Sequence, residues 1–139
     1  MNFGILGEAK IAREHVVPAI LNAGHKVTHV GRRIPGQAAL PKIYGNAIET
    51  DYEALINDTS VDAIYNPLPN HLHVPYSIEA LKAGKHVLCE KPAALNLDEL
   101  SQLENTAKDS KAFFYEAFMV RSHPQWHWLK NLRFFSQCH

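Results

Sequence analysis

The sequence has few cysteines, no excess of one charge and no long apolar run. Only Cys89 and Cys138 occur among 139 residues, which is too few for a disulfide framework and favours a reducing, cytoplasmic setting. The 14 Lys and Arg residues balance the 14 Asp and Glu residues, whereas binders of nucleic acids or anionic membranes carry a basic excess. No run approaches the roughly 18 apolar residues that cross a bilayer, and no basic segment typical of a signal peptide opens the chain. We therefore expect no nucleic-acid partner, no membrane span and no targeting segment.

Short apolar runs alternate with amphipathic segments over a length that suits one domain. The predicted strands cover residues 2–6, 26–30, 46–48, 62–66, 86–90 and 112–117. The predicted helices cover residues 11–23, 36–44, 51–57, 73–83 and 97–108. The strands are apolar on both faces, which is typical of parallel strands buried between helices. The alternation predicts an α/β fold with a doubly wound parallel sheet of the Rossmann type, which binds its ligand at the carboxyl ends of the strands.

Local signals refine the helices. Thr50 with Glu53, and Asn96 with Glu99, have the spacing of capping boxes. Pro18 lies inside the first predicted helix, where it predicts a kink or a division into two shorter helices.

The loop after the first strand has small residues at the spacing of a dinucleotide fingerprint. Gly7, Ala9 and Ala12 suit a tight turn, a close approach of pyrophosphate and helix packing, with Lys10 and Ile11 between them. Alanine replaces the second glycine of the usual motif. An ordinary strand–helix turn is therefore the alternative.

The loop after the second strand contains Arg32 and Arg33. Enzymes that use NAD usually have an acidic residue here for the ribose hydroxyl, but no acid lies between Glu14 and Glu49. A guanidinium group suits a phosphate dianion. We therefore predict NADP, with NAD less favoured, and favour Arg32 as the contact because it is nearer the strand. A solvated basic turn is the alternative.

The loop after the fourth long apolar run contains Pro67, Leu68, Asn70 and His71. Its two prolines predict a rigid wall beside an adenine or nicotinamide ribose. Asn70 could equally cap the next helix. His71 and His73 form an H-x-H pair without an evident third ligand, so we predict no metal site.

The next loop begins Glu90-Lys91-Pro92, at the place where the nicotinamide should lie. A partly desolvated lysine can hydrogen-bond a substrate hydroxyl and transfer its proton. Lys91 is therefore the candidate catalytic residue, and a surface lysine is the alternative. Cys89 is predicted to be a buried apolar residue rather than a nucleophile.

Farther along, Arg121 and His123 are candidate substrate or cofactor contacts, and Trp126 and Trp128 are expected to pack a helix.

Together these segments resemble the glucose-fructose oxidoreductase / inositol dehydrogenase / MocA family, with the dihydrodiol and D-xylose dehydrogenase-like members most similar. The resemblance covers residues 1 to about 130. It rests on the runs GILGEAKIA (4–12), YNPLPNHLH (65–73), GKHVLCEKP (84–92) and EAFM (116–119). It implies a dehydrogenase that uses NAD(P) and acts on a sugar, dihydrodiol or related alcohol, with Lys91 as the catalytic lysine. Glu90 would orient Lys91 and contact the cofactor, while Arg32 and the residues of the first and fourth loops would line its groove.

The family has two domains and well over 300 residues, so the resemblance divides this chain unequally. Residues 1–118 correspond to the NAD(P)-binding Rossmann domain, and residues 119–139 to a truncated start of the substrate domain, most of which is missing. The alternative to an active dehydrogenase is a non-catalytic NADP-binding fragment or truncated paralogue. A further alternative is an interaction protein, in which Trp128, Phe134 and Phe135 form an exposed apolar terminus that associates with other chains. The resemblance is also compatible with a homo-oligomer.

Overall fold

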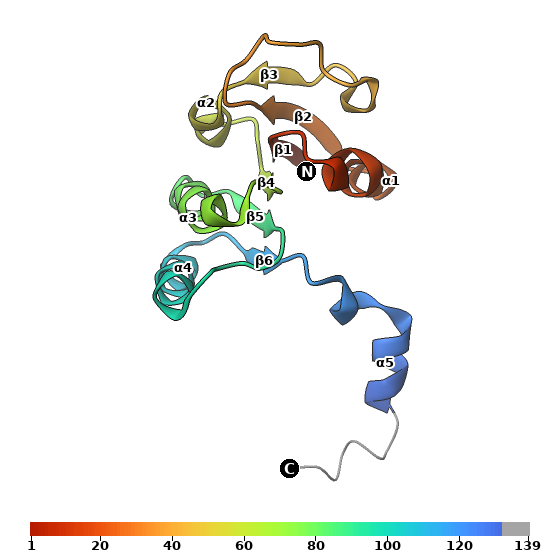
Figure 1. The fold of residues 1–139 in the computed structure, drawn as a ribbon, viewed down its shortest axis with the longest axis vertical. Coiled ribbons are helices and arrows are strands. Elements are labelled where there is room, and N and C mark those ends of the chain that lie inside the picture. Colours follow the sequence, from red (N-terminus) through yellow and green to blue (C-terminus); the bar gives the residue numbers. More distant parts are fainter. Residues whose placement is uncertain (132–139) are drawn as a thin grey trace.

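The computed structural model describes residues 1–131 and places six strands in one parallel sheet. The strand order is β3-β2-β1-β4-β5-β6, which confirms the predicted doubly wound sheet (Figure 1). The strands are β1 (Asn2–Leu6), β2 (Lys26–Gly31), β3 (Ile48–Thr50), β4 (Ala63–Asn66), β5 (His86–Cys89) and β6 (Phe114–Glu116). The order reverses between β1 and β4, which is where such sheets bind ligands.

Helices lie on both faces of this sheet. Three of them, α2 (Tyr52–Asn57), α3 (His73–Lys82) and α4 (Leu97–Asp109), lie along one side in Figure 1, and α1 (Val17–Asn22) lies on the other. The remaining helical segments are η1 (Ala12–Val16), η2 (Lys42–Tyr44), η3 (Asn70–Leu72), η4 (Met119–Ser122) and α5 (Pro124–Asn131). None of the helices within residues 1–131 is long and apolar enough to cross a membrane.

The two faces of the sheet build two separate cores. Successive residues of a strand point to opposite faces, so Ile5 packs with Val17 on the α1 side while Leu6 packs with Leu55 on the α2 side. All four side chains are fully buried. The sheet is thereby fixed from both sides, and its loops are held at one edge.

The first helix is divided as Pro18 predicts. Residues 12–16 form a wide π-type turn, and regular α geometry begins at Val17, with the proline in its first turn. Proline has no backbone N–H for the preceding turn, which accounts for the change of geometry there.

Five local predictions are wrong or only partly right. Most of the helix expected over residues 36–44 is absent, and only η2 forms. The cap of α2 is Asp51 instead of Thr50, since its carboxylate accepts the Ala54 N–H at 2.7 Å. Asn96 does cap α4, at 2.9 Å from the Glu99 N–H, but the Glu99 carboxylate binds the N–H of Leu95. The third and sixth strands are also displaced or shorter than expected.

Candidate functional site

The carboxyl ends of β1, β2, β4 and β5 meet at one edge of the sheet because all these strands are parallel. Leu6 pairs with Gly31, and Asn66 pairs with Cys89. The loops and helix starts that follow these residues contain the predicted site residues from Gly7 to Lys91, whereas Arg121 and His123 lie elsewhere. The fold therefore gathers those candidates along one edge, across the point where the strand order reverses.

The turn after β1 requires a glycine. Gly7 has a φ of +78°, in the left-handed region, and its N–H donates to the Gly31 carbonyl at 2.8 Å. A Cβ atom at this position would lie 3.2 Å from Cδ2 of Leu68. The turn thus lets the loop after β4 approach the loop after β1.

The rest of the fingerprint begins the first helix. Ala12 is fully buried, so its small side chain serves helix–sheet packing. Lys10 is exposed and pairs with Glu14 at 3.9 Å. The Ala9 carbonyl accepts the Arg13 N–H at 3.3 Å, whereas Ile11, at the start of η1, has no side-chain cap. The first backbone N–H groups are therefore not covered by a capping side chain, as anion binding requires.

Arg32 is committed to contacts within the protein. Its guanidinium donates to the Glu8 carboxylate, to the Glu49 carboxylate at 2.9 Å and to the Ala38 carbonyl. Burial lowers the pKa of Arg32, but the hydrogen bonds to Glu49 and Glu8 outweigh it and raise the pKa overall. The pKa of Glu49 is lowered, first by the Gly36 N–H and then by Arg32. The Arg32 side chain is only 11% exposed, so it acts as a cross-link between loops.

Arg33 has a different environment. Its side chain is exposed and forms no ion pair within residues 1–131. It borders a hollow of about 270 Å³ at the end of β2, together with Gly7, Glu8, Arg32, Ile34, Gln37, Ala38 and Tyr52. Of the two arginines, Arg33 is the one with its charge available in this hollow.

Tyr52 also lines this hollow, although no motif in the sequence marks it as a candidate. Its ring packs edge-on against Tyr76 at 5.2 Å between centroids, and a Cβ on Gly31 would lie 2.8 Å from its Cδ1 atom. Burial raises the pKa of Tyr52. Its position as the first residue of the helix after β3 was the available signal, because that helix start faces the same edge.

The loop after β4 is held from inside by Asn66. Its Oδ1 atom accepts the Leu68 N–H at 3.3 Å, and its Nδ2 atom donates to the His73 carbonyl at 3.1 Å. Pro67 and Leu68 are buried, while Asn70 and His71 are exposed. Asn70 belongs to η3 and does not cap α3, which has no side-chain cap.

The loop after β5 exposes Lys91 and holds Glu90. The Tyr65 hydroxyl donates to Oε1 of Glu90 at 2.7 Å. Lys91 is exposed, and within residues 1–131 it forms no ion pair with Glu90 or any other carboxylate. Burial raises the pKa of Cys89 to about 12, which suits a buried thiol rather than a nucleophile.

The remaining candidates lie apart from this edge. Arg121 and His123 are exposed on the segment that leads to α5, which extends away from the sheet in Figure 1. Trp126 and Trp128 are 42% and 62% exposed, so they do not pack as expected. Phe134 and Phe135 lie outside the described residues. Within residues 1–131, no three His, Cys, Asp or Glu side chains form a group that could hold a metal ion.

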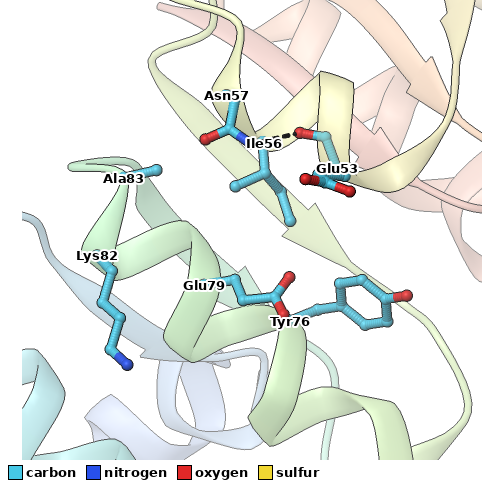
Figure 2. Close-up of a pocket in the computed structure, with 7 residues that line it drawn as sticks. All are labelled: Glu53, Ile56, Asn57, Tyr76, Glu79, Lys82 and Ala83. Atoms are coloured by element: carbon cyan, nitrogen blue, oxygen red, sulfur yellow. Dashed lines mark hydrogen bonds between the residues drawn. The ribbon is translucent and has the colours of Figure 1, made fainter.

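A hollow of about 590 Å³ also lies apart from these loops (Figure 2). It lies between α2 and α3, whose Glu53 and Glu79 approach it from opposite sides. Its lining combines the buried Ile56 with exposed side chains such as Glu53 and Lys82. Neither the predicted site residues nor Tyr52 contribute to it.

Comparison with known proteins agrees with the family resemblance of the sequence motifs. The family model for oxidoreductases with an NAD-binding Rossmann fold (GFO_IDH_MocA) matches residues 1–118. An uncharacterised oxidoreductase, ORF334 of Rhizobium meliloti, is 42% identical over 134 residues, which cover 91% of this chain and 39% of that protein. D-xylose 1-dehydrogenase (NADP⁺) 2 of Haloferax volcanii is 39% identical over 131 residues, which cover 89% of this chain and 39% of that protein.

A solved structure shares the fold. KijD10, a 3-ketoreductase from Actinomadura kijaniata crystallised with TDP-benzene and NADP, matches with a TM-score of 0.85 and 33% identity. The match covers 93% of this chain and 42% of KijD10. The chain therefore spans about two fifths of the length of each of these three relatives.

Proposed function

Because the chain belongs to the Gfo/Idh/MocA oxidoreductase family, with its NAD-binding Rossmann fold, we propose that it is the NADP-binding part of a dehydrogenase or reductase. The reaction transfers a hydride between the nicotinamide and a sugar, a dihydrodiol or a related alcohol. Residues 1–118 form the cofactor domain, and residues from 119 onward begin the substrate domain. The availability of Arg33 in the hollow beside Gly7 carries the choice of NADP.

The residues at the sheet edge fit the parts of a dinucleotide. Gly7, with Ala9, Lys10, Ile11 and Ala12, offers a glycine turn and uncapped backbone N–H groups to the pyrophosphate. Arg33 offers a guanidinium to the 2′-phosphate, and Arg32 fixes the loop that carries it. Pro67, Leu68, Asn70 and His71 line the remaining groove, with Leu68 directly opposite Gly7.

Lys91 is the residue that would act on the substrate. When bound, the cofactor supplies or accepts the hydride. The Lys91 side chain, exposed at the carboxyl end of β5, hydrogen-bonds the substrate oxygen. As an ammonium group it donates the proton when a carbonyl is reduced, and as the neutral amine it accepts that proton when a hydroxyl is oxidised. Glu90, bound by Tyr65, fixes the backbone just before Lys91.

Glu8 and Glu49 favour a second candidate for the cofactor. Both carboxylates lie beside Arg32 at the end of β2, and a carboxylate there suits the ribose hydroxyl of NAD. Their charges also oppose a phosphate dianion. NADPH binding then depends on Arg33, because the Arg32 charge is already paired.

Fluorescence titration with NADPH and NADH tests the cofactor choice. We expect tighter binding of NADPH, and we expect Arg33→Met to weaken NADPH about tenfold to a hundredfold, the effect of one charged hydrogen bond. Binding of NADH should change little. Lys108→Met, the same loss of charge on the exposed face of α4, is the control. Preference for NADH in the unsubstituted chain would contradict the proposal.

Turnover separates a catalytic chain from a non-catalytic NADP-binding module. The chain is assayed with NADP⁺ against a panel of sugars and diols. We expect Lys91→Met to abolish any turnover while NADPH binding persists. Binding without turnover by the unsubstituted chain would support the non-catalytic alternative instead.

A further inference from the structure

Among the described residues, Glu8 is the one acidic side chain that borders the hollow beside Gly7 and Arg33. It lies in the loop after β1, directly after the glycine turn, and its side chain is 23% exposed. Glu49 binds the same guanidinium group of Arg32 and is 20% exposed, but it belongs to β3 and does not border the hollow. The two carboxylates therefore share a partner, and Glu8 is the one that a ligand in the hollow would contact.

The Glu8 carboxylate has an oxygen that is free to accept a hydrogen bond. Both of its contacts with Arg32, from Nε and from Nη2, are made to the Oε2 atom. The Oε1 atom accepts no hydrogen bond from the residues that the structure describes. In dinucleotide-binding folds, a carboxylate oxygen near the end of the second strand accepts the ribose 2′-hydroxyl of NAD. The Oε1 atom of Glu8 suits that contact.

Arg32 does not cancel all of the negative charge beside it. Glu8 and Glu49 bring two carboxylates to one guanidinium group, so one negative charge of the three side chains is left over. Arg33, which forms no ion pair within residues 1–131, brings a positive charge to the same hollow. A phosphate dianion placed there is attracted by Arg33 and repelled by Glu8.

We propose that Glu8 and Arg33 act in opposite directions on the cofactor selectivity of this hollow. The Glu8 carboxylate accepts the 2′-hydroxyl of NAD and repels the 2′-phosphate of NADP, whereas Arg33 attracts that phosphate. The hollow therefore takes both cofactors, and the balance between the two side chains sets the preference for NADPH. This role of Glu8 rests on the proposed function, in which the dinucleotide lies along this edge of the sheet.

The ratio of the NADPH and NADH affinities isolates this effect, because the two cofactors differ only at the ribose 2′ position. Glu8→Gln removes the charge of Glu8 and keeps an oxygen that can accept the hydrogen bonds of Arg32. In fluorescence titrations, we expect this variant to bind NADPH about tenfold more tightly, because a like charge is removed from a partly screened site. NADH should bind no more tightly than before. An unchanged ratio in the folded variant would overturn the proposal.

Glu49→Gln is the matched control. It removes a carboxylate charge from the same guanidinium group at nearly the same exposure, but outside the hollow. We expect the ratio of the two affinities to change by less than about threefold, because solvent and counter-ions screen a charge that the cofactor does not contact. Equal shifts in the two variants would mean that selectivity follows the pairing of Arg32, and they would refute a direct role of Glu8.

Combining Glu8→Gln with Arg33→Met tests whether the two side chains oppose each other. The double variant loses one repulsion and one attraction, so its NADPH affinity should return to within about threefold of that of the unsubstituted chain. A double variant that binds NADPH as weakly as Arg33→Met alone would show that Glu8 does not repel the phosphate. Urea unfolding establishes that each variant is folded. If Glu8→Gln fails to fold, Glu8→Ala, which also removes the charge, should give the same shift of the ratio.

The outcomes separate this role from the proposed function. A chain that binds neither cofactor refutes the proposed function and the role of Glu8 with it. A chain that binds both cofactors, with a ratio that Glu8→Gln leaves unchanged, refutes the role of Glu8 alone. A chain that prefers NADH before any substitution contradicts the choice of NADP, but a shift toward NADPH in Glu8→Gln would still support the role of Glu8.

Discussion

The Tyr65 hydroxyl donates a hydrogen bond to Oε1 of Glu90 across 2.7 Å, which links β4 to the residue before Lys91. Tyr65 is fully buried on the α1 side of the sheet. Burial raises the pKa of this hydroxyl first, and the hydrogen bond to Glu90 adds to the effect. A neutral donor therefore holds Glu90 in place over the whole physiological pH range.

Removing this hydroxyl should cost stability. A hydrogen bond to a charged group contributes about 1.5–3 kcal/mol, so we expect Tyr65→Phe to lower the free energy of unfolding in urea by about that amount. Tyr115→Phe, at a half-exposed position on β6, is the control and should change it by less than about 0.5 kcal/mol. Equal effects of the two substitutions would show that the Glu90 contact does not contribute.

The Arg32 cross-link should be structural rather than specific for a cofactor. In Arg32→Met, the carboxylates of Glu8 and Glu49 lose their shared cation. We expect a loss of about 2–3 kcal/mol in the free energy of unfolding, from charged hydrogen bonds in a mostly buried position. The loss should shrink in the triple variant that also carries Glu8→Gln and Glu49→Gln. Stability unchanged from the original chain would contradict this role.

Two glycines with the same backbone conformation separate strain from crowding. Gly7 and Gly24 have φ values of +78° and +80°, but only Gly7 has neighbours that a Cβ would meet. We expect Gly24→Ala to cost about 1 kcal/mol through strain. Gly7→Ala should cost more and should also weaken NADPH binding. Urea unfolding measures the stability of the two variants, and fluorescence titration measures their NADPH binding. If the two variants lose stability and NADPH affinity equally, crowding of a Gly7 Cβ against Leu68 does not contribute.

The sequence predicts the strands and their parallel, doubly wound arrangement better than it predicts the contacts of individual side chains. The apolar runs locate β1 at residues 2–6, as the structure has it, because a buried strand must be apolar on both faces. The contacts of Arg32 could not be predicted in this way. Its position next to the strand end made it the favoured phosphate contact, but Glu8 reaches it from the loop after β1 and Glu49 from β3. No periodicity in the chain encodes this meeting, since it depends on how two loops and a strand come together at one edge.

The run from Gly84 to Pro92 contains both structural residues and candidate binding residues. Of this specific motif, Glu90 and Lys91 are the residues that we assign to the proposed cofactor and substrate site. Lys85 is 8% exposed and donates to the carbonyls of Asp58 and Val61, and His86 accepts the Phe113 N–H at 3.0 Å. Much of the motif therefore serves the sheet, and motif strength alone could not separate structural residues from binding residues.

Lys85 provides a direct test of that division. Its Nζ atom lies 2.7 Å and 2.8 Å from the two carbonyl oxygens, which would be left without this donor in Lys85→Met. We expect a loss of about 2–3 kcal/mol in the free energy of unfolding and NADPH binding that is unchanged in the folded protein. Lys82→Met, on the exposed side of α3, should cost little. Loss of NADPH affinity in folded Lys85→Met would place this lysine in the cofactor site.

The buried thiol of Cys89 should make the fold sensitive to alkali. Burial raises its pKa from 9.0 to about 12. The unfolded chain therefore loses this proton first as pH rises, and the folded state is destabilised between about pH 9 and pH 12. The slope reaches at most about 1.4 kcal/mol per pH unit for one group. Tyr44, whose pKa burial raises to about 12, and Tyr65 add to the slope only above about pH 10, where unfolded tyrosines ionise. The interval from pH 9 to pH 10 thus isolates the thiol.

Urea unfolding with a reductant present should show a decline of stability over this interval that Cys89→Ala removes, whatever that variant costs at neutral pH. Parallel curves for the two proteins would mean that the thiol ionises in the folded state as readily as in the unfolded chain.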